Sequence, residues 1–400
     1  VHQKTVVACV ITPGAGSKTR KVVRTFRTVT AEVESLREWL LENQVSQVAM
    51  ESTGVYWMPI YQVLACDELT LIVGNAAHIK NVPGRKSDVK AAEWLAHLVR
   101  HGLIRPSIVP TPTMRRLREF TRLRRSLVEE RTSTRNRILR LLETANIKLA
   151  SFASDVFGVS GSLMLDALIE GQMQPEEMAS LAKGVLRKKR NDLSLALRGK
   201  MEEHHRFLLR LHRNRIAQID DTIAQLDARI EKELEPLESI VARLVEVPGL
   251  DRVLAAVIIA ELGTDMSYFP THGHAAAWAG LSPGTNRSAG KKTRPESARY
   301  GNKYVRTALA QAATSACKVQ GSHYREKYLR VQRRRGAGRA IVATAHAILV
   351  SIYQMLKNHT PYNERGPAKP TDAQKTAIAK RLRSRLEQLG YEVDVKPKAA

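Results

Sequence analysis

Residues 5–12 (TVVACVIT) and 22–28 (VVRTFRT) decide the fold of the first part of this chain. Both stretches are rich in β-branched and apolar residues, and a Pro/Gly segment separates them, so they predict a β-hairpin. Helix and strand then alternate: we expect a helix at 30–43, a strand at 45–51, a helix at about 55–66, and strands at 69–73 and 104–109. A hairpin followed by β/α units predicts a mixed sheet with helices on its faces, hence an α/β domain over residues 1–110.

Beyond this domain the sequence becomes helical and basic. Residues 115–140 carry ten arginines, with apolar residues at roughly helical spacing, and predict a long basic amphipathic helix. Apolar residues from Ile219 to Leu237 recur every three or four positions, a heptad seam long enough for a coiled coil. The spacing leaves open whether the seam joins two chains or forms a helix hairpin inside one chain.

Three regions follow from these patterns. We expect a basic helical and coiled-coil region at 111–240, a second, mainly α-helical domain at 241–360, and a C-terminal helix and tail at 361–400. Residues 151–200 are less regular, and their pattern supports no specific structure.

The composition narrows the class of protein. With 43% hydrophobic and 26% charged residues, the chain is typical of a folded soluble protein rather than of a disordered basic tail. Lys and Arg number 64 against 39 Asp and Glu, and the resulting net charge of +25 requires a polyanionic partner. Three separated cysteines favour a reducing, cytoplasmic environment, and the longest purely apolar run, residues 253–260, is too short to cross a membrane. Because the chain opens on Val1 rather than Met, we expect residues upstream of it.

Two acids are candidates for a metal site. Glu51 ends an apolar strand, so its carboxylate is expected at the carboxyl edge of the sheet, where α/β proteins usually form their sites. Asp88 follows Ser87, a predicted helix N-cap, and its simplest role is to stabilise the first turn of that helix. Together, an acid at a strand end and one at a helix start can converge on Mg²⁺, as phosphoryl-transfer sites require.

The second domain offers a turn and a basic loop. Pro248 and Gly249 form a tight turn between two apolar helices, which resembles a helix-hairpin-helix, although Asp251 stands where a second glycine is usual. Ser288 lies in a Gly-rich loop with four cations, which suits the approach of a phosphodiester; the alternative is a solvated loop in which the serine only favours a turn. These cations are Arg287, Lys291, Lys292 and Arg294.

The separate motifs together resemble the DEDD-type transposases of insertion-sequence family 110, the bridge-RNA-guided recombinases of mobile elements. The resemblance extends over nearly the whole chain and rests on VHQKTVVACV, AMESTGVYW and GRKSDVKAAEWLA in the amino half, and on VPGL, WAGLSPGTNRSAGKK, YGNKYVRTAL and LEQLGYEVDV in the carboxyl half. It implies a RuvC-like amino-terminal domain of the ribonuclease H fold, which agrees with the predicted hairpin and β/α units.

The resemblance also implies four acids that bind Mg²⁺. Glu51 matches the second and Asp88 the third, the first falls immediately before Val1, and the fourth position is occupied by Ala91. Either this member lacks the fourth acid or the acid has been replaced to trap a complex; the close match of the surrounding residues favours replacement. Glu93 is a poor substitute, because five residues after Asp88 it points about 140° around the helix.

By the same resemblance, Ser288 attacks the scissile phosphate and holds the DNA as a phosphoserine, although Ala289 separates it from the glycine of the family's S-G motif. Acids and serine would come from different protomers of a dimer or tetramer, with the heptad seam as the candidate for joining them. A non-coding bridge RNA would select the DNA sequence. Cations would contact the phosphates of double-stranded DNA: Arg115, Arg116, Arg118, Arg122, Arg124, Arg125, Lys303, Arg306 and those of the Ser288 loop.

These expectations define a recombinase that excises and inserts a mobile element in the bacterial or archaeal cytoplasm, near the nucleoid. Two alternatives remain. One is a Mg²⁺-dependent junction-resolving nuclease in which water does the cleavage and Ser288 is incidental. The other is a catalytically impaired nucleic-acid-binding form, because Ala91 fills an acidic position.

Overall fold

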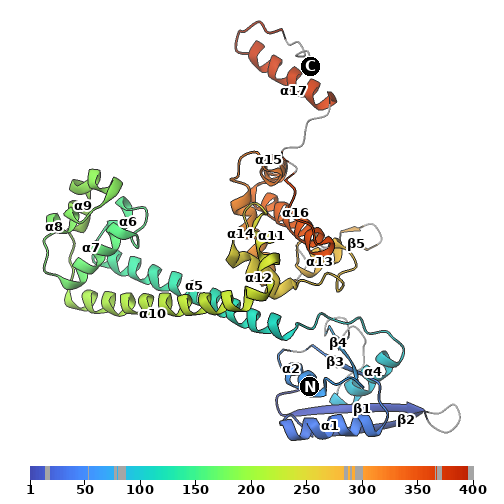
Figure 1. Cartoon of the computed structure of the whole chain (residues 1–400). Coiled ribbons are helices and arrows are strands. Elements are labelled where there is room, and N and C mark those ends of the chain that lie inside the picture. Colours follow the sequence, from blue (N-terminus) through green and yellow to red (C-terminus); the bar gives the residue numbers. More distant parts are fainter. Residues whose placement is uncertain are drawn as a thin grey trace. The chain divides into compact units, whose positions relative to one another are not determined.

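The structure is a computed structural model, shown in Figure 1, and it describes residues 1–13, 19–52, 54–75, 79, 87–282, 287–288, 291–292, 301–364, 366 and 372–394. The chain divides into two compact units, Val1–Pro110 and Thr111–Ala400. The first combines strands and helices, whereas the elements described in the second are helices and one pair of two-residue strands. Most of the chain is therefore helical, and its sheet content is small.

The first unit contains two separate pairs of strands. β1 (Thr5–Pro13) and β2 (Thr19–Arg27) form the predicted antiparallel hairpin, in a register that pairs the first residue of β1 with the last of β2. β3 (Gln47–Glu51) and β4 (Thr70–Gly74) run parallel, in step from their first residues to their last. The helices described in this unit are α1 (Thr30–Glu42), α2 (Trp57–Leu64) and α4 (Asp88–Arg100).

The predicted strand at 104–109 is wrong. This segment contributes one isolated bridge, between Pro106 and Gly74, and the amide of Ser107 donates to Val73 O over 2.7 Å. Pro106 has no N–H to give to a ladder, so the segment cannot extend the sheet despite its β-branched residues. The single mixed sheet is likewise seen only as two pairs within the described part of the chain.

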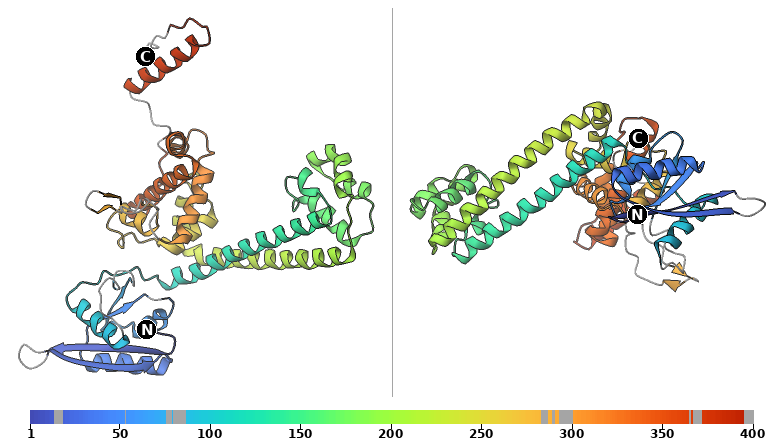
Figure 2. Two further views of the ribbon diagram at one scale, coloured as in Figure 1. Left: turned by 180° about the vertical axis from the view of Figure 1, so that it is seen from behind. Right: turned by 90° about the horizontal axis from the view of Figure 1, so that it is seen from below.

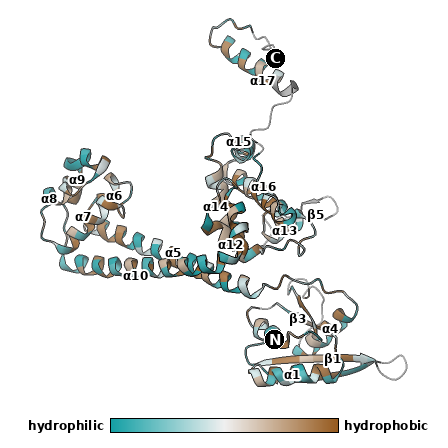
Figure 3. Cartoon of the chain, viewed as in Figure 1, coloured by the Kyte–Doolittle hydropathy of each residue, from teal (hydrophilic) through white to brown (hydrophobic). Residues whose placement is uncertain are grey.

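One apolar core holds the first unit together. The hairpin contributes Val6, Val10 and Phe26, which are buried against Trp39 and its neighbours on α1. Met50 on β3 and residues of α2 complete the cluster, and α4 packs on both β1 and β3. Figure 3 shows β1 coloured largely as hydrophobic. α4 therefore links the two strand pairs that the backbone ladders leave separate.

In the second unit, α5 (Pro112–Thr144) and α10 (Glu203–Leu234) pack side by side along much of their length, as Figures 1 and 2 show. Thr111 caps α5 by accepting from the amide of Met114, and Pro112 occupies the first helical turn, where its missing N–H has no cost. Ile219, Ile223 and Leu234 of the heptad seam are buried inside this chain. The seam thus forms an intramolecular hairpin, and these residues are not available to join two protomers.

Residues 151–200, which the sequence left without an interpretation, form a small helical subdomain at the far end of this hairpin. Its core joins Leu149, Met164 and Leu193 to Leu142 of α5 and Leu209 of α10. It is built from α6 (Leu149–Phe152), α7 (Val159–Glu170), α8 (Pro175–Ser180), the 3-10 helix η1 (Gly184–Lys189) and α9 (Arg190–Leu197).

Helices α13 (His272–Trp278), α14 (Lys303–Ala316) and α15 (His323–Arg335) pack around α16 (Ala337–Asn358). By length and composition alone, α16 could span a membrane, and half of the residues in that apolar window are buried by the packing of the other helices. The other elements are η2 (Glu235–Leu237), α11 (Glu238–Val245), α12 (Arg252–Leu262), β5 (Arg287–Ser288), β6 (Lys291–Lys292) and α17 (Asp372–Glu387).

Candidate functional site

A groove of about 1000 Å³ in the first unit is lined by both β1 and β3. Within the described residues, β1 pairs only with β2 and β3 only with β4, so each strand keeps one edge without a neighbouring strand. Glu51, Asp88 and Ala91 all line this groove, together with Val1. The structure therefore brings together the positions that the resemblance assigns to the second, third and fourth acids, beside the residue that would follow the first.

Local structure explains how the two acids reach the groove. Glu51 is the last residue of β3, and Asp88 is the first residue of α4, immediately after Ser87, whose hydroxyl accepts from the amide of Lys90 over 3.4 Å. His2 Nε2 lies 3.1 Å from Asp88 Oδ1, and the two side chains are 61% and 59% exposed. Ser87 is thus the helix cap, and the carboxylate of Asp88 remains accessible from solvent.

Ala91 lies one helical turn after Asp88, and its methyl side chain has no atom that can bind a metal ion. Glu93 points elsewhere: it is absent from the groove lining, and its Oε2 forms an ion pair with Nζ of Lys21 on β2 over 3.3 Å. Proteins usually hold Mg²⁺ with one or two carboxylates, while the ion keeps several waters and takes its other oxygens from substrate phosphates. The donor set at the groove fits such an ion.

A second group of metal-binding residue types has a structural explanation. Ligand atoms of Glu202, His204 and His205 lie within 4.8 Å of one another at the start of α10. Nδ1 of His205 accepts from the amide of Glu202 over 3.2 Å, and the Glu202 side chain accepts in return from the helix, which is a capping box. The positive end of the helix dipole disfavours a cation at this place.

The arginines of α5 are mostly engaged inside the second unit. Arg115, like Lys303 and Arg306 of α14, has no acidic partner among the residues that the structure describes. Three others form ion pairs with half-buried or exposed acids: Arg116 with Glu233, Arg124 with Asp227, and Arg125 with Glu129. Two of these acids, Glu233 and Asp227, lie on α10, so the arginines of α5 meet carboxylates outside their own helix as well as within it.

Glu261 is completely buried and neutralises two further arginines of α5. Its carboxylate accepts hydrogen bonds from Arg122, from Nε over 2.7 Å and from Nη2 over 2.9 Å. Arg118 Nε lies 3.5 Å from the same carboxylate and donates to the carbonyl oxygen of Ala260 over 2.7 Å. Burial lowers the pKa of Arg118. Arg118 and Arg122 thus hold α5 against α12.

The Ser288 loop is anchored at its base. The backbone pairs Ser288 with Lys291 between β5 and β6; Arg294 lies outside the described residues. Gly301 abuts Gly280 so closely that an added Cβ would lie 2.3 Å from the Gly280 amide nitrogen, and Asn302 N donates to Trp278 O over 3.0 Å. Nδ2 of Asn302 also donates to Glu261 over 2.7 Å, so the buried acid fixes the point where the loop returns to α14.

The Pro248–Gly249 turn is explained by packing. Gly249 has a φ of +87°, and an added Cβ would lie 2.2 Å from the carbonyl oxygen of Ala312 on α14. Asp251 caps α12 by accepting from the amide of Leu254 over 2.8 Å. A carboxylate therefore already occupies the amino end of α12, where the backbone amides of a helix-hairpin-helix would contact a phosphate.

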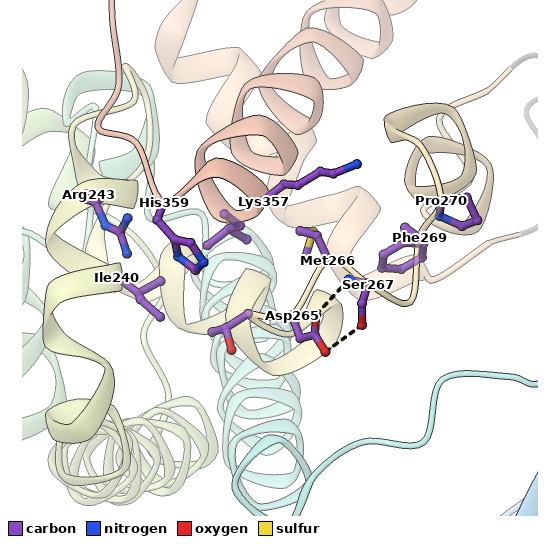
Figure 4. A pocket seen from close by; sticks show the side chains of 11 residues that line it. Ile240, Arg243, Asp265, Met266, Ser267, Phe269, Pro270, Lys357 and His359 are labelled. Atoms are coloured by element: carbon purple, nitrogen blue, oxygen red, sulfur yellow. Dashed lines mark hydrogen bonds between the residues drawn. The ribbon is translucent and has the colours of Figure 1, made fainter.

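A cationic pocket of about 550 Å³ lies between α11, residues 264–270 and the end of α16 (Figure 4). Arg243, Lys357 and His359 line it, and the acid in its lining is Asp265. Hydrogen bonds from the amide and hydroxyl of Ser267, each 2.8 Å long, lower the pKa of Asp265. The balance of charge in this pocket suits an anion.

Sequence reasoning missed a cluster of free cations on α15 and the start of α16. Their guanidinium groups have no acidic partner among the described residues, and all five side chains are exposed. The signal was the run of three arginines at the end of α15. The cluster, which we call the α15 arginine cluster, consists of Arg330, Arg333, Arg334, Arg335 and Arg339.

Comparison with known proteins agrees with this arrangement. A family model for DEDD transposases of IS110, described as "Transposase", matches residues 1–147, and a second, described as "Transposase IS116/IS110/IS902 family", matches residues 241–329. The chain belongs to the IS110 family of transposases. The first match contains Glu51, Asp88 and the arginines of α5, and the second contains Ser288.

A curated relative of this IS110-family chain is the "Insertion element IS110 uncharacterized 43.6 kDa protein" of Streptomyces coelicolor. It is 34% identical over 148 residues, which are 36% of this chain and 34% of the relative. The chain thus spans about a third of the length of the curated relative that it matches.

Proposed function

We propose that this chain is the recombinase of an insertion sequence, which cleaves, exchanges and rejoins DNA strands through a covalent link to Ser288. The observation that carries the proposal is the groove in which Glu51, Asp88 and Ala91 meet beside Val1. Membership of the IS110 family and the net charge of +25 support it.

In this proposal Glu51 and Asp88 hold Mg²⁺, and their exposure leaves room for a phosphate. The ion, when bound, would neutralise charge that builds up on the phosphate oxygens during transfer. A bond forms between Ser288 Oγ and phosphorus, the bond from phosphorus to the departing sugar oxygen breaks, and the serine's proton passes by way of a base to the oxygen that leaves. The phosphodiester energy is kept in the phosphoserine, so a second strand can be joined without another energy source.

The alanine at position 91 leads to a separate prediction about the metal binding and the cleavage activity of this chain. With one acid missing from the groove, we expect weak metal binding and slow or absent cleavage. Ala91→Asp would place a third carboxylate one helical turn from Asp88, on the same side of α4. The proposed partners are double-stranded DNA, a non-coding bridge RNA and further copies of the chain. The free cations of the α15 arginine cluster support the proposal that DNA and RNA bind.

The decisive experiment tests for the covalent link. The Ala91→Asp variant, expressed with the non-coding DNA that flanks its element, is incubated with Mg²⁺ and a plasmid carrying the element's ends. After nuclease digestion, mass spectrometry should find a nucleotide on the peptide containing Ser288, and Ser288→Ala should abolish both adduct and cleavage.

Two other outcomes would overturn the proposal. Cleavage without an adduct, unaffected by Ser288→Ala, would identify a nuclease that uses water. Absence of cleavage with the restored acid would identify a nucleic-acid-binding form. Sequencing the RNA that stays bound at high salt tests separately whether a bridge RNA guides the protein. One discrete RNA from the flanking DNA supports guidance by RNA, and a heterogeneous, salt-labile mixture overturns it.

A further inference from the structure

A pocket of about 500 Å³ lies at the junction of α5, α10, α12 and α14, in the second unit. Apolar side chains of each helix line it, among them Val128, Ile230, Val257 and Ala308. Its volume is within the range of pockets that hold small organic molecules. The site does not overlap with the acidic groove or with the Ser288 loop.

An aromatic ring surrounded by cations forms part of the lining. The guanidinium carbon of Arg122 lies 4.3 Å from the ring centroid of Tyr304, and that of Arg125 lies 5.5 Å from it. The side-chain nitrogen Nζ of Lys303 lies 5.0 Å from the same centroid. Aromatic rings and guanidinium planes are the surfaces on which proteins stack unpaired bases.

The charges around this pocket are balanced. Arg124, Arg125 and Arg252 line it together with the acids that neutralise them, Asp227, Glu129 and Glu231, and Arg122 is neutralised by Glu261. Such a lining is unsuited to a bare phosphate, in contrast to the pocket of Figure 4. It suits a flat, uncharged ligand whose edge carries both hydrogen-bond donors and acceptors.

Arg125 supplies an independent indication of a missing ligand. Its Nε donates to Glu129 over 2.8 Å, but its Nη1 is buried and has no hydrogen-bond partner among the residues that the structure describes. A buried donor without an acceptor is costly, and such a group calls for a water or a ligand. Arg125 also lines the pocket, so a turn of its guanidinium toward the pocket would bring this donor to an oxygen or ring nitrogen of a base.

We propose that this pocket binds one unpaired nucleobase, stacked in the neighbourhood of Tyr304 and accepting a hydrogen bond from Arg125. The inference rests on the proposed function only in so far as that function supplies a nucleic acid. The base comes either from a DNA strand opened during exchange or from a loop of the RNA, and the chemistry of recognition is the same for both.

The test compares fluorescent single-stranded octamers of DNA and RNA with matched octamers that carry one abasic position at the centre. We expect the base-containing octamer to bind the full chain at least tenfold more tightly, and Val257→Phe, which fills the pocket, to remove this advantage. Val342→Phe, at an exposed position of α16 outside the pocket, is the matched control and should keep it. Whichever of DNA or RNA shows the advantage identifies the source of the base.

Because Val257→Phe can disturb packing, Tyr304→Leu provides a second variant, and thermal unfolding of both must match the parent chain. A photoreactive 4-thiouridine octamer should crosslink to α12 or α14. The proposal is overturned when the parent chain binds abasic and intact octamers equally, or when folded Val257→Phe and Tyr304→Leu both keep the full advantage. A base-dependent advantage in a chain that never forms a Ser288 adduct would support this pocket and overturn the recombinase, so the two proposals fail separately.

Discussion

Glu261 illustrates how single residues of this chain are fixed by partners far away in the sequence. The carboxylate has no exposed surface, and Arg122 and Asn302 reach it from α5 and from the start of α14. Its burial is tolerable because each oxygen accepts hydrogen bonds from a charged or amide donor. The same contacts fix the return of the Ser288 loop, so this acid serves both the packing of the second unit and the shape of its candidate site.

Glu261→Gln should therefore destabilise the second unit strongly. The variant leaves two arginines, one of them only 15% exposed at its side chain, without a counter-charge, and we expect a loss of about 3 kcal/mol in the free energy of unfolding. Urea unfolding followed by circular dichroism measures it. Glu176→Gln is the control: that acid pairs with Arg198 at side-chain exposures of 57% and 61%, and because solvent screens an exposed pair, its loss should lower the free energy of unfolding far less. Equal losses in the two variants would contradict the assignment.

His346 on α16 makes stability depend on pH. Burial, together with the nearby charges of Lys327 on α15 and His272 on α13, lowers the pKa of this histidine. The unfolded chain, with a pKa of about 6.5, then takes up a proton before the folded chain does. The contribution of His346 is complete above that value and is lost as the pH falls from about 6.5 through the lower folded pKa. His346→Gln should flatten this part of the pH profile of unfolding between pH 7.5 and 5.5; an unchanged profile would exclude His346 as its source.

At the scale of the elements, the turn between α11 and α12 shows a glycine required by both conformation and space. Gly249→Ala would place a side chain at a φ of +87° and against the backbone of α14. We expect a loss of more than about 2 kcal/mol, because left-handed strain adds to the clash. Gly338→Ala, in the first turn of α16 with no atom within 4 Å of the new Cβ, should be neutral or slightly stabilising. Thermal unfolding of the two variants measures the difference in stability. A Gly249→Ala variant as stable as the parent chain would show that the turn does not pack as described.

The elements that could be predicted from sequence are those with a local cause. The hairpin, the strands that became β3 and β4, and the long helix α5 all follow from composition and periodicity within a few turns of chain. The partners of the α5 arginines could not be predicted, because Asp227 and Glu261 lie more than a hundred positions away and only the packing of α10 and α12 brings them close. The acids of the candidate site were found by their positions at a strand end and a helix start, whereas the Tyr304 pocket depends on four helices and has no local signal.

At the scale of the whole molecule, the net charge of +25 is divided between two kinds of cation. Arginines of α5 are mostly neutralised within the second unit, while those of the α15 arginine cluster have no acidic partner in the described part of the chain. Only cations that meet phosphates release counterions on binding, so the salt dependence of DNA affinity reports which group touches the backbone.

Replacing Arg333, Arg334 and Arg335 together by Gln should therefore reduce the slope of log affinity against log salt for duplex DNA by about 2.7, since each phosphate contact contributes about 0.9. The matched control removes the same three charges from internally paired positions, Arg116, Arg124 and Arg131, the last of which contacts Asp220 over 2.6 Å. This variant should change the slope by less than about 1, because its arginines already have carboxylate partners. Fluorescence anisotropy between 50 and about 300 mM salt measures both slopes. Equal reductions would mean that the overall charge, rather than the α15 arginine cluster, governs DNA binding, and a larger effect at the α5 positions would mean that these ion pairs open to release their arginines to the phosphates.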